Sequence, residues 1–120
     1  MLYIKNTKLV LETGILWDAV LVLNNDRIAG YGTSSEIEIP DGAEVLDAGG
    51  LYTGPGFVDI HVHGGGGAVF TKEPEKAAKH FVDCGETTIL PTLYYDLSKK
   101  GFIEAIRLIK NVKETTEAGR

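Results

Sequence analysis

The sequence predicts an α/β protein with a strand-rich first part and a second part in which strands and helices alternate. Apolar runs before about residue 50 are short, separated by turn signals, and show no convincing helical period. Beyond residue 55 the pattern changes to strand, helix, strand, helix, which is the order of βα units. Between these patterns, an apolar strand ends in two histidines and four consecutive glycines. We therefore predict two domains, residues 1–53 and residues 54–120.

The first part is predicted to form a small sheet. Strands are expected in four apolar or alternating segments, residues 8–11, 19–23, 27–32 and 44–47. Asn-Asn-Asp at 24–26 is a hairpin signal, and Pro-Asp-Gly at 40–42 is a second turn signal. Such a sheet on its own would have unpaired edges.

The strand predicted at 56–63 carries the most informative side chains. Alternate residues of a strand point to opposite faces, so Asp59, His61 and His63 share a face with Phe57. That face becomes more polar toward the carboxyl end of the strand. The opposite face is apolar and mostly β-branched, and we expect helices to cover its three residues, Val58, Ile60 and Val62.

Two helices and a further strand follow. The first helix is expected at 74–84, because proline suits the first helical position and Gly85 stands just past the end. A strand is expected at 87–92, and a second helix from residue 98 or 99 to 114. Cys84 is expected as a small buried hydrophobe. One face of the second helix should point inward, with Phe102, Ile103, Ile106, Ile109 and Val112.

His61 and His63 are candidate metal ligands. A single histidine at a strand end is more often a hydrogen-bonded structural residue, but two on one face can converge on one cation. A catalytic zinc site takes three protein ligands and a water, so further ligands must come from elsewhere. Asp59, two residues earlier, either orients a ligand or makes a structural hydrogen bond or ion pair.

The four glycines Gly64, Gly65, Gly66 and Gly67 have two interpretations. They form a substrate loop in which the backbone approaches a ligand closely, or they form a simple flexible turn that leaves the strand. The segment lacks the Gly-Lys-Ser/Thr ending of a P-loop. Tyrosines at 94 and 95, after the next strand, either line a pocket or pack, and Thr92 is placed to approach the site.

The segment 47–63, Asp-Ala-Gly-Gly-Leu-Tyr-Thr-Gly-Pro-Gly-Phe-Val-Asp-Ile-His-Val-His, resembles the first barrel strand of the metal-dependent amidohydrolase superfamily. The general signature of that superfamily is Pro-Gly-Phe-hydrophobic-Asp-x-His-x-His. The glycine run, Gly-Glu-Thr-Thr at 85–88 and Pro-Thr at 91–92 narrow the resemblance to the N-terminal part of N-acetylglucosamine-6-phosphate deacetylases. The similarity runs from Ile28 to about Thr92.

The resemblance implies a fold. It predicts the N-terminal half of a small β-sandwich followed by the first two βα units of a TIM (β/α)8 barrel. Because such a barrel typically needs ~250 residues, 120 residues would be a truncated piece of it.

The resemblance also implies an activity. It predicts removal of acetate from N-acetylglucosamine 6-phosphate by metal-activated water, in amino-sugar catabolism. His61 and His63 would bind a divalent metal, zinc or iron, with two metals per intact subunit. The other metal ligands and the catalytic carboxylate belong to later strands, so the 120 residues contain no catalytic residue and are expected to be inactive alone. The partners implied are a small sugar phosphate and a second subunit in a homodimer.

Composition excludes several other classes. The apolar and charged contents, 43% and 24%, are ordinary for a globular protein. A net charge of −5 with scattered basic residues argues against nucleic acid as a partner. No apolar run approaches the ~20 residues of a membrane span, and the N-terminus does not resemble a signal peptide. A single cysteine fits a reducing cytoplasm.

Two alternatives remain open from the sequence. In the first alternative, the parent enzyme is another amidohydrolase, such as a cyclic amidase of the dihydroorotase kind, although the glycine run favours the deacetylases. In the second alternative, the chain is a non-catalytic binding or assembly module that shares part of an enzyme fold, although such a module has no need of the histidine pair.

Overall fold

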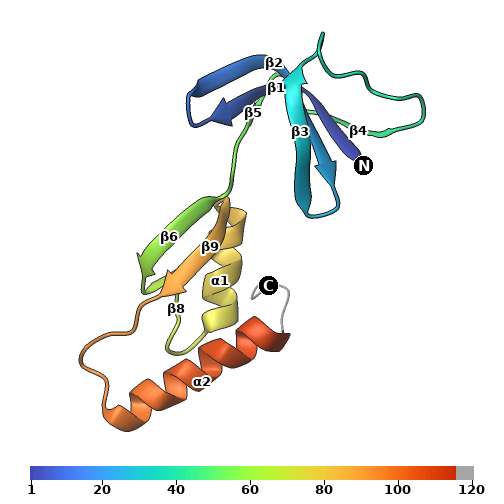
Figure 1. The fold of residues 1–120 in the computed structure, drawn as a ribbon. Coiled ribbons are helices and arrows are strands. Elements are labelled where there is room, and N and C mark those ends of the chain that lie inside the picture. The colour runs from blue at the N-terminus through green and yellow to red at the C-terminus, as the bar shows by residue number, and fades with distance from the viewer. Residues whose placement is uncertain (116–120) are drawn as a thin grey trace. The chain divides into compact units, whose positions relative to one another are not determined.

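The computed structural model of the chain describes residues 1–115, so the last five residues of the predicted second domain lie outside the described part. Two compact units are present, the first from Met1 to Pro55 and the second beginning at Gly56 (Figure 1). Within residues 1–115, no helix is both long enough and apolar enough to cross a bilayer.

The first unit is built on a five-stranded mixed sheet. Its elements are β1 (Leu2–Leu11), β2 (Gly14–Asn24), β3 (Arg27–Thr33), β4 (Glu44–Asp47) and β5 (Tyr52–Thr53). The strand order is β3-β2-β1-β4, and β5 also pairs with β1. The β1–β2 and β2–β3 pairs are antiparallel, whereas β4 and β5 run parallel to the two halves of β1. The predicted strands and the hairpin turn between β2 and β3 are confirmed, with the turn residue Asn25 at φ 54°.

Two small apolar clusters hold this sheet together. One contains Tyr3, Val20 and Val22, packed against side chains of the segment 37–43. The other contains Leu9, Ala19 and Leu21 with their aliphatic neighbours. Each cluster draws on both β1 and β2, so burial of these side chains fixes the register of the longest strand pair.

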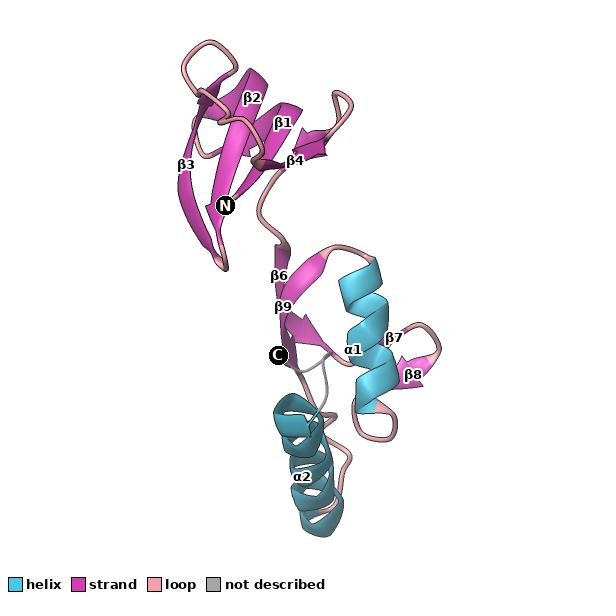
Figure 2. Ribbon diagram, turned by 90° about the vertical axis from the view of Figure 1, so that its right-hand side faces the viewer, coloured by secondary structure: helices cyan, strands magenta, loops and turns pink. Residues whose placement is uncertain are grey.

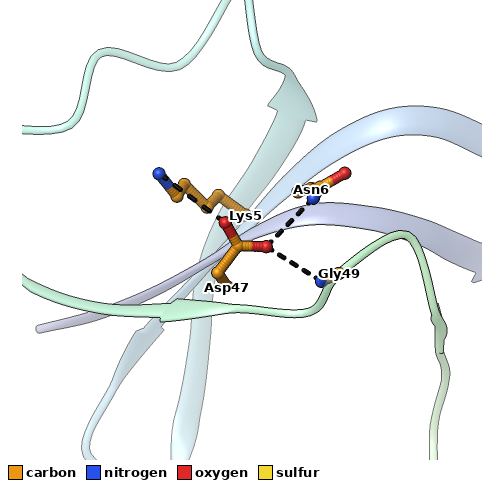
Figure 3. Close-up of polar contacts among 4 residues, drawn as sticks. All are labelled: Lys5, Asn6, Asp47 and Gly49. Atoms are coloured by element: carbon orange, nitrogen blue, oxygen red, sulfur yellow. Dashed lines mark hydrogen bonds and ion pairs between the residues drawn. The ribbon is translucent and has the colours of Figure 1, made fainter.

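Asp47 closes the turn that follows β4 (Figure 3). Its Oδ1 accepts hydrogen bonds from the Gly49 amide (2.8 Å) and from Nδ2 of Asn6 (3.0 Å), and Lys5 Nζ lies 3.9 Å from its Oδ2. These donors favour the ionised carboxylate, so the pKa of Asp47 lies below its ordinary value, first because of Gly49 and then because of Asn6.

The second unit contains the predicted alternation of strands and helices. It comprises β6 (Phe57–Val62), β7 (Gly64–Gly65), β8 (Ala68–Val69), α1 (Pro74–Asp83), β9 (Glu86–Pro91) and α2 (Lys99–Thr115). Strands β6 and β9 pair in parallel, and the short β7 and β8 form an antiparallel hairpin between β6 and α1. Figure 2 shows β6 and β9 side by side, with α1 running along them.

The core of the second unit lies where α1 meets β9, β7 and β8. Phe70 is 2% exposed and stacks on Phe81 of α1, with ring centroids 6.0 Å apart. Val62 at the end of β6 is also buried in this cluster. The core is therefore built around the carboxyl end of β6, next to the two histidines.

Two predictions about burial are wrong. Val58 and Ile60 of β6 are 63% and 74% exposed, because helical cover in the described residues reaches only Val62 on that face. On α2, the expected inward residues Phe102, Ile103 and Ile106 are exposed, whereas Val112, also expected to point inward, is buried, as is Ala105. The later turns of α2 approach the core of this unit, where Ile109 packs against the buried cluster.

Candidate functional site

The site begins at the carboxyl ends of two parallel strands. Strand β6 carries His61, His63 directly follows its last residue, and strand β9 runs beside β6 in the same direction. The amide of Thr92, just after β9, donates a 2.7 Å hydrogen bond to the carbonyl of Val62. Pairing therefore continues past β9 and brings the segment after it next to His63; the neighbouring strands β6 and β9 are visible in Figure 1.

His63 is held by two contacts from that segment. Its Nδ1 lies 2.7 Å from the carbonyl oxygen of Thr92. A carbonyl can only accept, so Nδ1 carries the hydrogen and the neutral ring keeps its lone pair on Nε2. The ring also stacks on Tyr94, with centroids 4.3 Å apart and planes 10° from parallel. Half-buried His63 thus presents a basic nitrogen in a defined orientation.

His61 is exposed and lies edge-on to His63. The two ring centroids are 5.1 Å apart, with planes at 80°. Half-buried Asp59 accepts a 2.8 Å hydrogen bond from the backbone amide of His61 through its Oδ1. Of the two roles considered for Asp59, the structure contains the hydrogen bond, and this bond acts on the backbone that carries His61.

The histidine pair fits a divalent metal. With metal–nitrogen bonds of about 2.1 Å and tetrahedral angles, two imidazoles on one zinc ion have centroids about 5 Å apart. The observed separation of 5.1 Å matches that arrangement. Across residues 1–115, no group of three or more His, Cys, Asp or Glu side chains is placed to hold a metal. The described part therefore offers two candidate ligands for such a centre, and metal binding by this pair stays a prediction.

The glycine run forms a tight hairpin packed on helix α1. Gly66 and Gly67 occupy the left-handed region, at φ 60° and 75°. A Cβ on Gly65 would lie 2.5 Å from Cδ2 of His80, and one on Gly66 would lie 2.9 Å from the Cβ of His80. The hairpin is anchored at its other end by the amide of Phe70, which donates to the carbonyl of His63. The glycines thus have a packing role, and their contact with a substrate remains a prediction.

Cys84 differs from its prediction. It is exposed, and its Sγ lies 3.9 Å from Nε2 of His80 one helical turn earlier. The residue caps the end of α1, where its amide bonds the carbonyls of the last turn and leaves the side chain outside the core.

The residues that sequence analysis understated are those after β9. Thr92 was expected near the site and is there, but its backbone carbonyl makes the contact, since its hydroxyl donates to Leu90. Tyr94 was expected to line a pocket or to pack, and it stacks on a candidate ligand instead. The sequence contained one signal that could have located these residues: two consecutive βα strands pair in parallel, which places the carboxyl end of β9 beside the carboxyl end of β6. Tyr95 is fully exposed.

A groove of about 560 Å³ lies elsewhere in the second unit, between α1, β9 and α2. Its lining is mostly apolar and includes Phe70, Ile89 and Ile109, but neither His61 nor His63. This groove is therefore separate from the candidate metal site.

Comparison with known proteins places these features in context. No protein-family model matches the chain. Among curated proteins, an adenine deaminase of Listeria monocytogenes serovar 1/2a is 33% identical over 90 residues, which cover 74% of this chain and 14% of that protein. A dihydroorotase of Staphylococcus aureus is 35% identical over 92 residues, covering 76% of this chain and 21% of the relative.

Solved structures share the fold over almost the whole chain. N-acetylglucosamine-6-phosphate deacetylase from Pasteurella multocida matches 96% of this chain and 31% of its own, with a TM-score of 0.78 and 20% identity. The deacetylase from Mycobacterium smegmatis matches 96% of this chain and 33% of its own, with a TM-score of 0.71 and 22% identity. At such identities the likeness establishes the fold.

The chain spans only a small share of these proteins, 14% of the adenine deaminase and about a third of the deacetylases. The matched α/β fold corresponds to the N-terminal part of amidohydrolase domains. The curated relatives include both a deaminase and a dihydroorotase, which are enzymes of one superfamily. The predicted superfamily is thereby confirmed, and the chain belongs to the amidohydrolase superfamily.

Proposed function

We propose that this chain forms the first part of a metal-dependent N-acetylglucosamine-6-phosphate deacetylase. One observation carries the proposal: the ring centroids of His61 and His63 lie 5.1 Å apart at the carboxyl end of β6, and the hydrogen bond of His63 Nδ1 to Thr92 leaves the lone pair of the neutral ring on Nε2. The TM-scores to two such deacetylases support it.

The proposal includes the rest of the architecture. Strand β6 with α1 and strand β9 with α2 would be the first two βα units of a (β/α)8 barrel, whose active site lies at the carboxyl ends of its strands. The five-stranded sheet of the first unit would be half of a β-sandwich that later strands complete. We keep residues 1–53 and 54–120 as the proposed domains.

The residues of this chain have defined tasks in the proposed site. His61 and His63 would bind zinc or iron as neutral imidazoles, and the intact subunit would hold two metals. When bound, the metal would supply polarisation of the acetyl carbonyl and a lowered pKa for the hydrolytic water. The carbonyl of Thr92 accepts a hydrogen bond from Nδ1 of His63, so the neutral ring carries its lone pair on Nε2. Asp59 holds the backbone of His61. The general acid–base carboxylate would come from a later strand.

Acetate release tests the proposal. The intact protein that contains this chain should deacetylate N-acetylglucosamine 6-phosphate, and His61→Ala with His63→Ala should lower kcat/KM by at least about a hundredfold. The third histidine of the chain, His80, lies on helix α1, so His80→Ala is the matched control and should retain activity. Failure to release acetate, with turnover of another amidohydrolase substrate, rejects the deacetylase.

The sequence relatives favour a second candidate, a deaminase or a cyclic amidase. The chain is 33% identical to an adenine deaminase and 35% identical to a dihydroorotase, more than to the two deacetylases. The same protein assayed with adenine and with dihydroorotate separates the candidates, because the first reaction releases ammonia and the second opens a ring. If the intact protein turns over none of these substrates, both enzyme hypotheses are rejected in favour of a non-catalytic binding or assembly module.

We further propose a small sugar phosphate as the ligand, a homodimer as the intact enzyme and the cytoplasm as its compartment. The single cysteine supports the compartment, since it provides no internal disulfide. Gel filtration of the intact protein tests the homodimer, subcellular fractionation tests the compartment, and the acetate-release assay tests the ligand.

A further inference from the structure

We propose that Tyr94 is a positioning residue for the metal ligand His63, an inference that rests on the proposed metal-binding function. Tyr94 follows β9 by three residues and stacks on the His63 ring with a centroid distance of 4.3 Å and an interplanar angle of 10°. The stack covers one face of the imidazole and leaves its edge, which carries Nε2, for the metal.

The placement of Tyr94 is unusual for a packing residue. The residue is 42% exposed, and the hydrophobic core of the second unit is built from other residues. The ring is therefore held near the surface, in contact with a half-buried histidine rather than with the apolar cluster. Burial of a large apolar surface does not account for its position.

Two contacts from one short segment together fix His63. The Thr92 carbonyl holds Nδ1 in the plane of the ring, and Tyr94 prevents the ring from tilting out of that plane. The segment is itself tied to β6 by the hydrogen bond from the Thr92 amide to Val62. A hydrogen bond alone leaves the imidazole free to rock about it, whereas a stacked ring opposes that motion.

A fixed ring binds metal more tightly than a mobile one. A ligand that is already oriented loses less side-chain freedom when it coordinates. Groups that orient metal-binding histidines typically contribute 10–100-fold to metal affinity. We therefore expect Tyr94→Ala to weaken zinc binding about tenfold, at the lower end of that range, because the Thr92 hydrogen bond remains.

The test is a Zn²⁺ titration of the intact protein that contains this chain, with NMR of the ring signals of His61 and His63. Tyr94→Ala should lower the zinc affinity about tenfold, and Tyr94→Phe, which keeps the stacked ring, should restore it to within about twofold. Tyr95→Ala is the matched control, because Tyr95 is adjacent and fully exposed, and it should bind zinc like the unmodified chain. In the metal-free chain, the upfield ring-current shift of the His63 protons should vanish in Tyr94→Ala alone.

The outcomes separate the two proposals. Zinc binding at both histidines with equal affinity in the unmodified chain and in Tyr94→Ala overturns the positioning role and leaves the metal site intact. An equal loss of zinc affinity in Tyr95→Ala also overturns the positioning role, since the loss would then come from a general disturbance of the loop after β9. If zinc does not shift the signals of His61 and His63 in the unmodified intact protein, the proposed metal-binding function fails, and the positioning role fails with it.

Discussion

Substituting alanine for Gly66 should destabilise the second unit more than the same change at Gly67. Both glycines lie in the left-handed region, at φ 60° and 75°, where an alanine side chain costs about 1–2 kcal/mol. A Cβ at Gly67 meets nothing within 4 Å, whereas one at Gly66 lies 2.9 Å from the Cβ and Cγ of His80. Overpacking of this kind adds about 1–3 kcal/mol. We expect the unfolding free energy of the second unit to fall by about 2–5 kcal/mol in Gly66→Ala and by about 1–2 kcal/mol in Gly67→Ala.

Two optical signals make this measurement specific. Both helices of the described residues lie in the second unit, so circular dichroism at 222 nm during urea unfolding follows that unit. The chain has one tryptophan, Trp17 in β2, and its fluorescence follows the first unit. Gly66→Ala should lower the urea midpoint of the dichroism signal more than Gly67→Ala, with the fluorescence transition unchanged.

Equal midpoints for the two variants would refute the reasoning. The glycine run would then have no tight contact with α1, and only backbone conformation would require glycine there. Gly65→Ala gives an independent check, because this residue lies outside the left-handed region and its Cβ would lie 2.5 Å from His80. A loss of about 1–3 kcal/mol is expected from overpacking alone.

Three further predictions concern stability. Because Asp47 and Glu36 have pKa values below their ordinary 3.8 and 4.5, owing to donors from Gly49 and Thr33, the first unit should hold its full stability above pH 4.5 and lose it as pH falls. Urea midpoints from Trp17 fluorescence test this, and an unchanged acid slope in Asp47→Asn with Glu36→Gln would contradict it. Phe70→Ala should lower the unfolding free energy of the second unit, followed by dichroism, by about 3–5 kcal/mol, and a loss below about 1 kcal/mol would contradict the central place of Phe70 in the core. Lys8→Met should cost the first unit about 0.5–1 kcal/mol, because its ammonium lies over two exposed aromatic rings, and a stabilised variant would contradict this.

Sequence analysis located the elements because their signals are local. The proline and glycine that bound α1, the Asn-Asn-Asp turn and the alternation along β6 each report on a few neighbouring residues. The histidine pair was found for the same reason, since residues i and i+2 of a strand share a face whatever surrounds them.

Burial was predicted less well because it depends on distant partners. Val58 and Ile60 have the apolar pattern of a covered strand, yet they are exposed among the described residues. That pattern is suited to a sheet with helices along its whole face, and α1 reaches only the end of β6. The stack of Tyr94 on His63 was also beyond local patterns, because it depends on the register between two strands 29 or more residues apart.

The central claim is that His61 and His63 are ligands of an amidohydrolase metal centre. Its most direct test is the metal content per subunit of the intact protein, measured with and without the substitutions His61→Ala and His63→Ala. We predict two divalent metals per subunit in the unmodified protein and a lower content in the double variant, with His80→Ala unchanged. A content of one metal that the double variant retains in full would contradict the assignment of both histidines.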